Sequence, residues 1–234
     1  MTVIENKGTE SALGSKSVLL KGRSYLMLSI VSFTAMQIVL KELVGVPIAQ
    51  IVFFRGLIAL LISGATLALR FEDPRRGPIF LLMSRGLFGT LSIFLFVQSV
   101  QSLHLATAAS LQYLAPLFTV LFAGPLLKEW PTPWIIFAFL VSSLGVFILN
   151  GISVSSLSAS VWIGVASAFF SGISYNIIRM LHGRASPDVV VFWFSLVIVG
   201  VTGVYAFVSW QTPDQTALIY LILAGLCSHF GQVF

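Results

Sequence analysis

Charged side chains are scarce in this sequence. Asp, Glu, Lys and Arg make up 9% of the 234 residues, whereas hydrophobic residues make up 57% and the mean hydropathy is +1.00. Soluble domains carry roughly a quarter charged residues, so this chain cannot cover a water-exposed surface. Its apolar side chains must therefore face lipid as well as one another.

The sequence also lacks the residue clusters that metal proteins and enzymes use. Its single cysteine, Cys227, excludes an internal disulfide, and no HExxH, phosphate-loop or GxSxG motif occurs. His104, His182 and His229 are dispersed at opposite predicted membrane depths, which favours neither a metal site nor a Ser–His pair. We therefore predict no metal, no cofactor and no enzymatic activity.

Long apolar runs are what the sequence does contain. A bilayer core needs about 20 apolar helical residues, whereas membrane strands have about ten residues and alternate. Eight runs suit helices: 24–40, 48–69, 78–100, 104–127, 131–150, 160–181, 189–210 and 216–234. The predicted fold class is an all-α polytopic membrane helical bundle. Residues 1–23 are interpreted as a polar cytoplasmic tail, and the first run as a retained helix because no small-residue cleavage site follows it.

The basic residues predict the orientation of the bundle. With the N-terminus in the cytoplasm, only Lys41 lies in an outer segment, and Arg55 and Arg85 lie within runs. The inner segments hold Lys7, Lys16, Lys21, Arg23, Arg70, Arg75, Arg76, Lys128, Arg179 and Arg184. Because cytoplasmic loops of membrane proteins are enriched in Lys and Arg, we predict a membrane protein with a cytoplasmic N-terminus. The basic charge thus indicates topology and does not favour a nucleic-acid partner.

A weak internal repeat accompanies the runs. PIAQIVFF begins at Pro47 and PDVVVFWF at Pro187, 140 residues later and in a run of opposite direction. Inverted repeats are typical of secondary transporters. The predicted domains are a first five-helix repeat at 24–150 and an incomplete second repeat at 160–234, with eight spans of an expected ten. We accordingly expect the chain to be a fragment or a truncated reading frame.

Several residues in this order resemble EamA-type permeases of the drug/metabolite transporter superfamily. They are Phe54-Arg55, Arg85-Gly86, Leu105-Ala106-Thr107-Ala108, Pro116, Glu129, Gly145-Val146 and the SGISYN segment at 171–176. The resemblance implies a ten-helix inner-membrane carrier of amino acids, amines, nucleotide-like compounds or other small metabolites.

The fourth run is broken by polar and helix-disrupting residues. Pro116 removes the N–H that would bond the carbonyl of Gln112, and a freed carbonyl in hydrocarbon is costly. We expect Gln112, Tyr113 and Pro116 to line a central wet cavity, with a kink packed on a neighbouring helix as the alternative. On the same helical pattern, Leu111 and Leu114 are expected to face lipid.

Two arginines and a polar pair are further candidates. Arg55 could bind a substrate carboxylate, tie down carbonyls of a neighbouring helix or extend outward to water, whereas Arg85 is expected to reach the cytoplasmic face. Tyr175 and Asn176 could line the cavity, or Asn176 could make an interhelical hydrogen bond. Gly164, Ala168 and Gly172 form a small-residue stripe for close helix contact.

The favoured function is a secondary transporter of a small organic metabolite that works by alternating access. The alternative is a non-transporting membrane scaffold or a degenerate fragment of such a permease. The expected partners are the lipid bilayer and a small-molecule solute, with a homodimer as an open option for assembly and no nucleic acid.

We predict that Arg55→Ala lowers uptake of an anionic or zwitterionic substrate and leaves expression intact, because the guanidinium offers a two-pronged donor to a carboxylate. The measurement is uptake kinetics in vesicles, normalised to the amount of protein. Unchanged kinetics would remove Arg55 from the substrate site.

Overall fold

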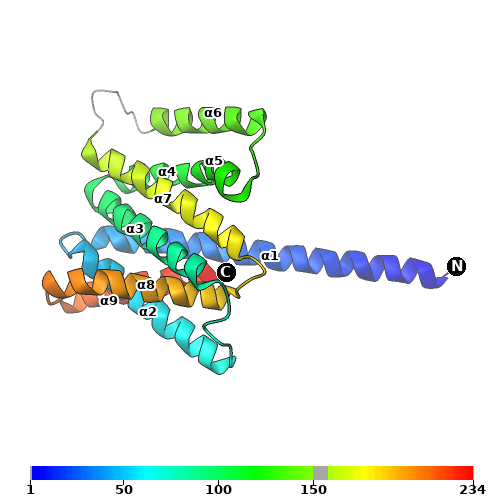
Figure 1. Ribbon diagram of the computed structural model, residues 1–234, viewed down its shortest axis with the longest axis horizontal. Helices are drawn as coiled ribbons and strands as arrows, with labels where there is room; N and C mark the ends of the chain where they lie inside the picture. The colour runs from blue at the N-terminus through cyan, green and yellow to red at the C-terminus, as the bar shows by residue number, and fades with distance from the viewer. Residues whose placement is uncertain (1, 150–157, 234) are drawn as a thin grey trace.

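The computed structural model describes residues 2–149 and 158–233, and within these ranges every regular element is a helix (Figure 1). The helices are α1 (Thr2–Glu42), α2 (Ile48–Leu69), α3 (Ile79–Ser102), α4 (Leu105–Gln112), α5 (Leu114–Leu127), α6 (Pro133–Leu149), α7 (Ala159–Leu181), α8 (Pro187–Val208) and α9 (Gln215–Val233). The predicted all-α membrane bundle is confirmed. Helix α1 also takes in residues 2–23, which the sequence indicated as a polar tail.

Six predicted spans meet the length and hydropathy that a membrane crossing needs. Among the described residues these are Gly22–Glu42, Ile48–Leu69, Ile79–Ser102, Leu105–Leu127, Ala159–Leu181 and Pro187–Val208. The other two predicted spans are helical but lie outside this set: α6 has 17 residues and α9 has 19.

Proline and serine fix where several helices begin. Pro47 precedes α2 and Pro78 precedes α3, both with extended ψ angles. At the start of α8, Ser186 Oγ accepts a hydrogen bond from the Val189 N–H at 3.3 Å, and Pro187 follows at the first helical position. Proline suits that position because its missing N–H would have no helical partner there.

The structure confirms the break in the fourth run. Helix α4 ends at Gln112 and α5 begins at Leu114, with Pro116 in its first turn. The expected lipid-facing side is wrong, because Leu111 and Leu114 are 0% and 5% exposed and pack with Val161 of α7. The break re-aims the segment, so a single continuous helical pattern could not place these leucines.

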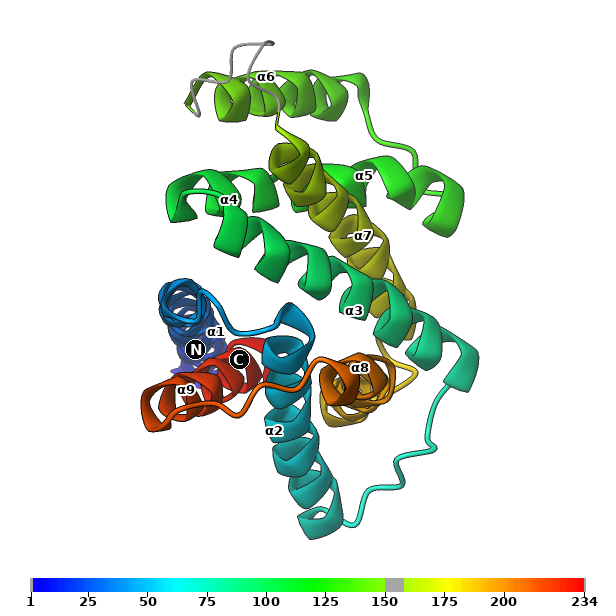
Figure 2. The same ribbon diagram turned by 90° about the vertical axis from the view of Figure 1, so that its left-hand side faces the viewer.

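Close packing of α7 depends on its small residues, as predicted. A Cβ on Gly172 would lie 2.9 Å from the Thr119 backbone nitrogen in α5, and a Cβ on Gly164 would lie 2.7 Å from Leu111 Cδ1 in α4. Ala168 between them is fully buried. Helix α7 therefore lies directly against α3, α4 and α5 (Figures 1 and 2).

The helix contacts follow a symmetric pattern. Helix α1 packs on α9 and α7 on α3, while α2 packs on α9 and α8 on α3, and α2 and α8 contact each other. Exchanging α1, α2 and α3 with α7, α8 and α9 reproduces the same set of contacts. Each exchanged helix runs in the opposite direction to its counterpart (Figure 1). Helices α2 and α8 both have 22 residues, and Arg55 and Phe194 are each the eighth.

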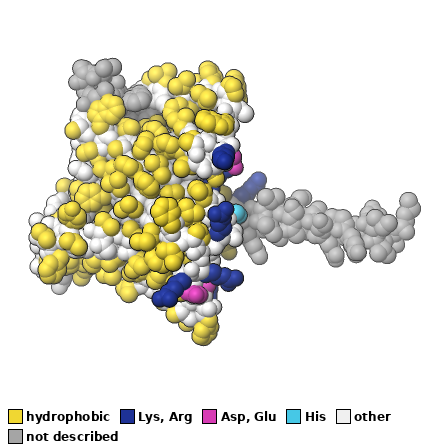
Figure 3. All heavy atoms as spheres, viewed as in Figure 1, with side chains coloured by type: hydrophobic (Ala, Val, Ile, Leu, Met, Phe, Trp, Pro, Cys, Tyr) yellow, Lys and Arg dark blue, Asp and Glu magenta, His cyan; other side chains and the backbone are white. Residues whose placement is uncertain are grey.

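Charged side chains gather at one end of the bundle, which we call the basic end. On the face in Figure 3, Lys and Arg lie along one edge beside acidic side chains, and hydrophobic side chains cover the rest. Two ion pairs connect elements at this end: Arg70 to Asp188 at 2.6 Å and Arg179 to Glu129 at 2.7 Å. The hydrophobic side chains that cover the rest of this face match the predicted exposure to lipid.

We predict that Gly172→Ala lowers the free energy of unfolding by about 1–3 kcal/mol, because the new methyl group would collide with the α5 backbone. The matched control is Gly200→Ala in α8, where nothing lies within 4 Å of an added Cβ. We expect this control to be neutral or to stabilise by up to about 1 kcal/mol, since alanine favours helix. The measurement is the thermal unfolding midpoint in detergent. Equal shifts of the two variants would contradict the packing argument.

Candidate functional site

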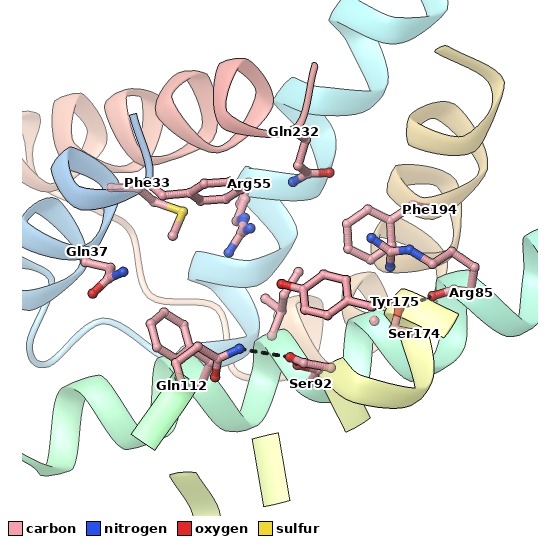
Figure 4. Close-up of a pocket in the computed structure, with 15 residues that line it drawn as sticks. Phe33, Gln37, Arg55, Arg85, Ser92, Gln112, Ser174, Tyr175, Phe194 and Gln232 are labelled. Carbon is pink, nitrogen blue, oxygen red and sulfur yellow. Dashed lines mark hydrogen bonds between the residues drawn. The ribbon is translucent and has the colours of Figure 1, made fainter. Parts of the chain in front are cut away.

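A cavity of about 210 Å³ lies where α1, α2, α3, α4, α7, α8 and α9 meet (Figure 4). We call it the central cavity. Its polar lining residues are Gln37, Arg55, Arg85, Ser92, Gln112, Ser171, Ser174, Tyr175 and Gln232. Its other lining residues are Phe33, Met36, Gly89, Ile93, Phe96 and Phe194. So many polar groups inside a membrane bundle usually mark a solute or ion pathway.

Arg55 lies inside the bundle and points into the central cavity. Arg55 is 4% exposed, and its Nε donates a hydrogen bond to Ser228 Oγ of α9 at 2.5 Å. This bond orients the guanidinium while its terminal amino groups face the cavity (Figure 4). The structure thus keeps Arg55 away from water outside the bundle.

Arg85 departs from the expectation that it reaches the cytoplasmic face. It is 9% exposed, and its guanidinium carbon lies 4.0 Å from the centre of the Phe194 ring. A Cβ on Gly89, one turn later in α3, would overlap Arg85 Nη1, so the missing side chain makes room for the guanidinium. The Phe194 ring and the space beside Gly89 together stabilise Arg85 in an orientation towards the cavity. The position of Arg85 along its run could not indicate this orientation.

Gln112 belongs to a hydrogen-bonded cluster on one wall of the cavity. Its Nε2 donates to Ser171 Oγ at 2.9 Å, and its Oε1 accepts from Ser167 Oγ at 3.3 Å. Ser92 Oγ lies 2.5 Å from Ser171 Oγ. The cluster joins α3, α4 and α7 at the level of the helix break, so the amide that ends α4 is both satisfied and available to the cavity.

Tyr113 and Pro116 lie beside the central cavity. They line a second hollow of about 660 Å³, the side cavity, between α1 and the α4–α5 break. Gln37, Gln112 and Tyr175 line both hollows, so the two adjoin. Tyr175 is 44% exposed and its ring projects into the central cavity (Figure 4).

Asn176 lies outside the lining of both cavities. It is 0% exposed, and its Nδ2 donates to the Thr119 carbonyl at 2.8 Å and to the Gly172 carbonyl at 3.0 Å. The bond to Thr119 joins α7 to α5. Of the two alternatives for this residue, the structure shows an interhelical hydrogen bond.

Sequence reasoning missed several cavity residues. Gln37 lies near the end of its run, and an isolated amide in an apolar span was the available signal. Ser92 carried no signal, because serine is common in packed membrane helices. Ser171 and Ser174 entered only as part of the SGISYN segment of the family resemblance. In the sequence nothing distinguishes Phe194 from other apolar residues, and only the structure shows that its ring contacts the Arg85 guanidinium.

The electrostatics of the site are one-sided. Two arginines line the central cavity, and no Asp or Glu lines either cavity among the residues that the structure describes. A guanidinium offers a fork of N–H donors that matches carboxylate and phosphate oxygens. The arrangement can hold an anionic group, and no cluster of three or more His, Cys, Asp or Glu side chains occurs in the described chain to hold a metal ion.

A polar cavity inside an apolar helical bundle defines a polytopic membrane protein of the solute-transporter class. The chain belongs to the EamA-like transporter family, whose pattern matches residues 20–151. The resemblance found in the sequence is thereby confirmed.

The relatives and a solved structure agree with this assignment. The chain is 32% identical over 211 residues to the pseudopaline exporter CntI of Pseudomonas aeruginosa, covering 87% of this chain and 72% of that protein. It is 27% identical over 241 residues to the human solute carrier family 35 member G1, covering 91% and 63%. A protein crystal structure shares the fold with a TM-score of 0.62 at 17% identity, covering 90% of this chain and 78% of that one.

Proposed function

We propose that the chain carries a small organic metabolite across the inner (plasma) membrane by alternating access, with the central cavity as the solute site. The observation that carries this proposal is the cavity itself, which collects two arginines, amides and hydroxyls inside the bundle. In the proposal, Arg55 binds an anionic group of the solute. Gln112 and Tyr175 supply hydrogen bonds.

The helix arrangement supports the alternating-access part of the proposal. The contacts that recur when α1–α3 are exchanged with α7–α9 are those expected of two inverted halves. They support the proposed repeats at 24–150 and 160–234. In inverted-repeat transporters the halves rock around a midplane site at their interface. Here α2 and α8 meet on that interface and contribute Arg55 and Phe194 to the cavity.

The remaining predicted site residues take supporting roles in this proposal. Tyr113 and Pro116 line the side cavity, which gives the solute a route past the α4–α5 break. Asn176 acts indirectly, since its bond to the Thr119 carbonyl holds α5 against α7. The similarity to a protein named as a pseudopaline exporter supports movement of an organic solute and makes export the first direction to test.

Solute flux in vesicles tests the proposal. The 234-residue chain, reconstituted in proteoliposomes, is screened with labelled amino acids, amines, nucleotides and organic acids. We expect saturable flux of one class, accelerated by the unlabelled solute on the opposite side, because a carrier reorients fastest when loaded. Empty vesicles and the Arg55→Ala variant are the controls. If the reconstituted chain shows no flux but binds a protein partner tightly, the result would favour a membrane scaffold instead.

The same proposal places the basic end in the cytoplasm, following the asymmetry of Lys and Arg. Cysteine labelling checks it in a Cys227→Ser background, which removes the single native thiol. Ser209→Cys lies between α8 and α9 and His182→Cys between α7 and α8, and both positions are exposed. We expect a membrane-impermeant maleimide to label Ser209→Cys on intact cells and His182→Cys only after the cells are opened. The reverse pattern would invert the topology.

A further inference from the structure

We propose that the solute carries two anionic groups, one for each of the buried arginines Arg55 and Arg85. This inference rests on the proposed function and narrows its substrate class to organic dianions, such as dicarboxylates. It follows from the charges in the central cavity, from the donors that each guanidinium leaves open, and from the depth of the two side chains.

No described residue that lines the central cavity supplies a counter-charge for these arginines. Of the eight acidic residues, two precede the first apolar run (Glu5 and Glu10). The others lie in loops or in the end turns of helices: Glu42, Glu72, Asp73, Glu129, Asp188 and Asp214. The ion pairs found among the described residues use Asp188 and Glu129 at the basic end, with Arg70 and Arg179. Within the residues that the structure describes, the central cavity therefore holds two positive charges that no ion pair compensates.

An uncompensated guanidinium inside a membrane protein is expensive, and such groups persist where they face a pathway or meet a partner. Tyr, Gln and Ser side chains in the lining supply dipoles but no negative charge. A solute with two anionic groups neutralises the site completely, a monoanion or zwitterion leaves net positive charge, and a cationic amine adds to it. Complementary charge thus favours the dianion over the other classes.

Each guanidinium leaves donors directed at the cavity. Arg55 is fixed through Nε by Ser228 Oγ, which leaves its terminal amino groups for the solute. Arg85 stacks on Phe194, so the ring covers one face while the N–H groups in the guanidinium plane stay open. Arg85 Nε is buried and has no hydrogen-bond partner among the described residues. Both groups are oriented in advance for planar, two-pronged anions.

The two arginines lie at different depths in the bundle. Arg55 is the eighth residue of α2 and Arg85 the seventh of α3, counted from opposite ends of the bundle. At 1.5 Å per residue in a core of about 30 Å, their Cα atoms are on the order of 10 Å apart along the bundle axis. Phe33, Met36 and Phe96 offer apolar surface to a carbon frame between the anionic groups.

Binding of matched diacids and esters tests this inference. The probes are the straight-chain dicarboxylates of three to eight carbons, each with its monomethyl and dimethyl ester, so that charge changes while the frame stays the same. The readouts are the dissociation constant from thermal shift of the reconstituted 234-residue chain, and flux in proteoliposomes. We expect at least one diacid to bind about tenfold or more tightly than its monoester, because each charge-assisted interaction contributes at least that factor. Sulfate and inorganic phosphate, which lack a carbon frame, should bind more weakly.

Variants assign the two anionic groups to the two arginines. We expect Arg55→Met and Arg85→Met each to weaken diacid binding by about tenfold or more and to abolish the preference for diacid over monoester. Loss of that preference separates a binding role from a structural one. Replacing a buried charge with an apolar side chain of similar length does not by itself unfold a protein. The control is Arg184→Met in the exposed loop before α8, which should keep both the affinity and the preference.

The outcomes separate this inference from the proposed function. The dianion inference is overturned if binding or flux is strongest for neutral, zwitterionic or cationic solutes, or if no diacid of the series binds. In that case flux of another solute would still support the carrier function. If diacids bind in a way that depends on both arginines but no flux is found, the inferred dianion site is supported and the proposed carrier function is overturned.

Discussion

The hydrocarbon core of the membrane supplies neither hydrogen-bond partners nor counter-charges, and this constraint organises the whole molecule. Every polar group that the spans contain has to be met inside the bundle. The broken fourth span, the two arginines and the serines and glutamines of neighbouring helices therefore gather around one central cavity. The same constraint leaves the acidic residues in the tail, the loops and the helix ends, where water or basic side chains reach them.

Close helix packing makes the polar interior possible. Helix α7 approaches α4 and α5 through Gly164 and Gly172, which brings Ser167 and Ser171 within hydrogen-bond distance of Gln112. Gly89 has a comparable role in α3, where its missing side chain leaves space for the Arg85 guanidinium. Polar chemistry and small residues thus depend on each other in this fold.

The helix contacts are approximately symmetric, but the distribution of charged residues over the exchanged helices is not. Arg55 and Phe194 occupy the same position in α2 and α8, yet one brings a cation and the other an aromatic ring. Phe194 stacks on Arg85, so both cations come from the first half and the second half supplies the surfaces that hold them, with Ser228 fixing Arg55. An approximately symmetric frame with a one-sided charge is the basis of the preference for anions that we propose.

The sequence by itself determined six of the eight predicted spans, the break after Gln112 and the family, because these follow from hydropathy, proline geometry and local residue order. Only the tertiary structure decided which side chains share the cavity. Arg85 turns inward because Phe194 and Gly89 make room for it. Leu111 and Leu114 are buried because they pack against α7, and the Asn176 amide bonds to the Thr119 carbonyl of a neighbouring helix. Each of these depends on a neighbour distant in sequence, and no periodicity within a single span contains that information.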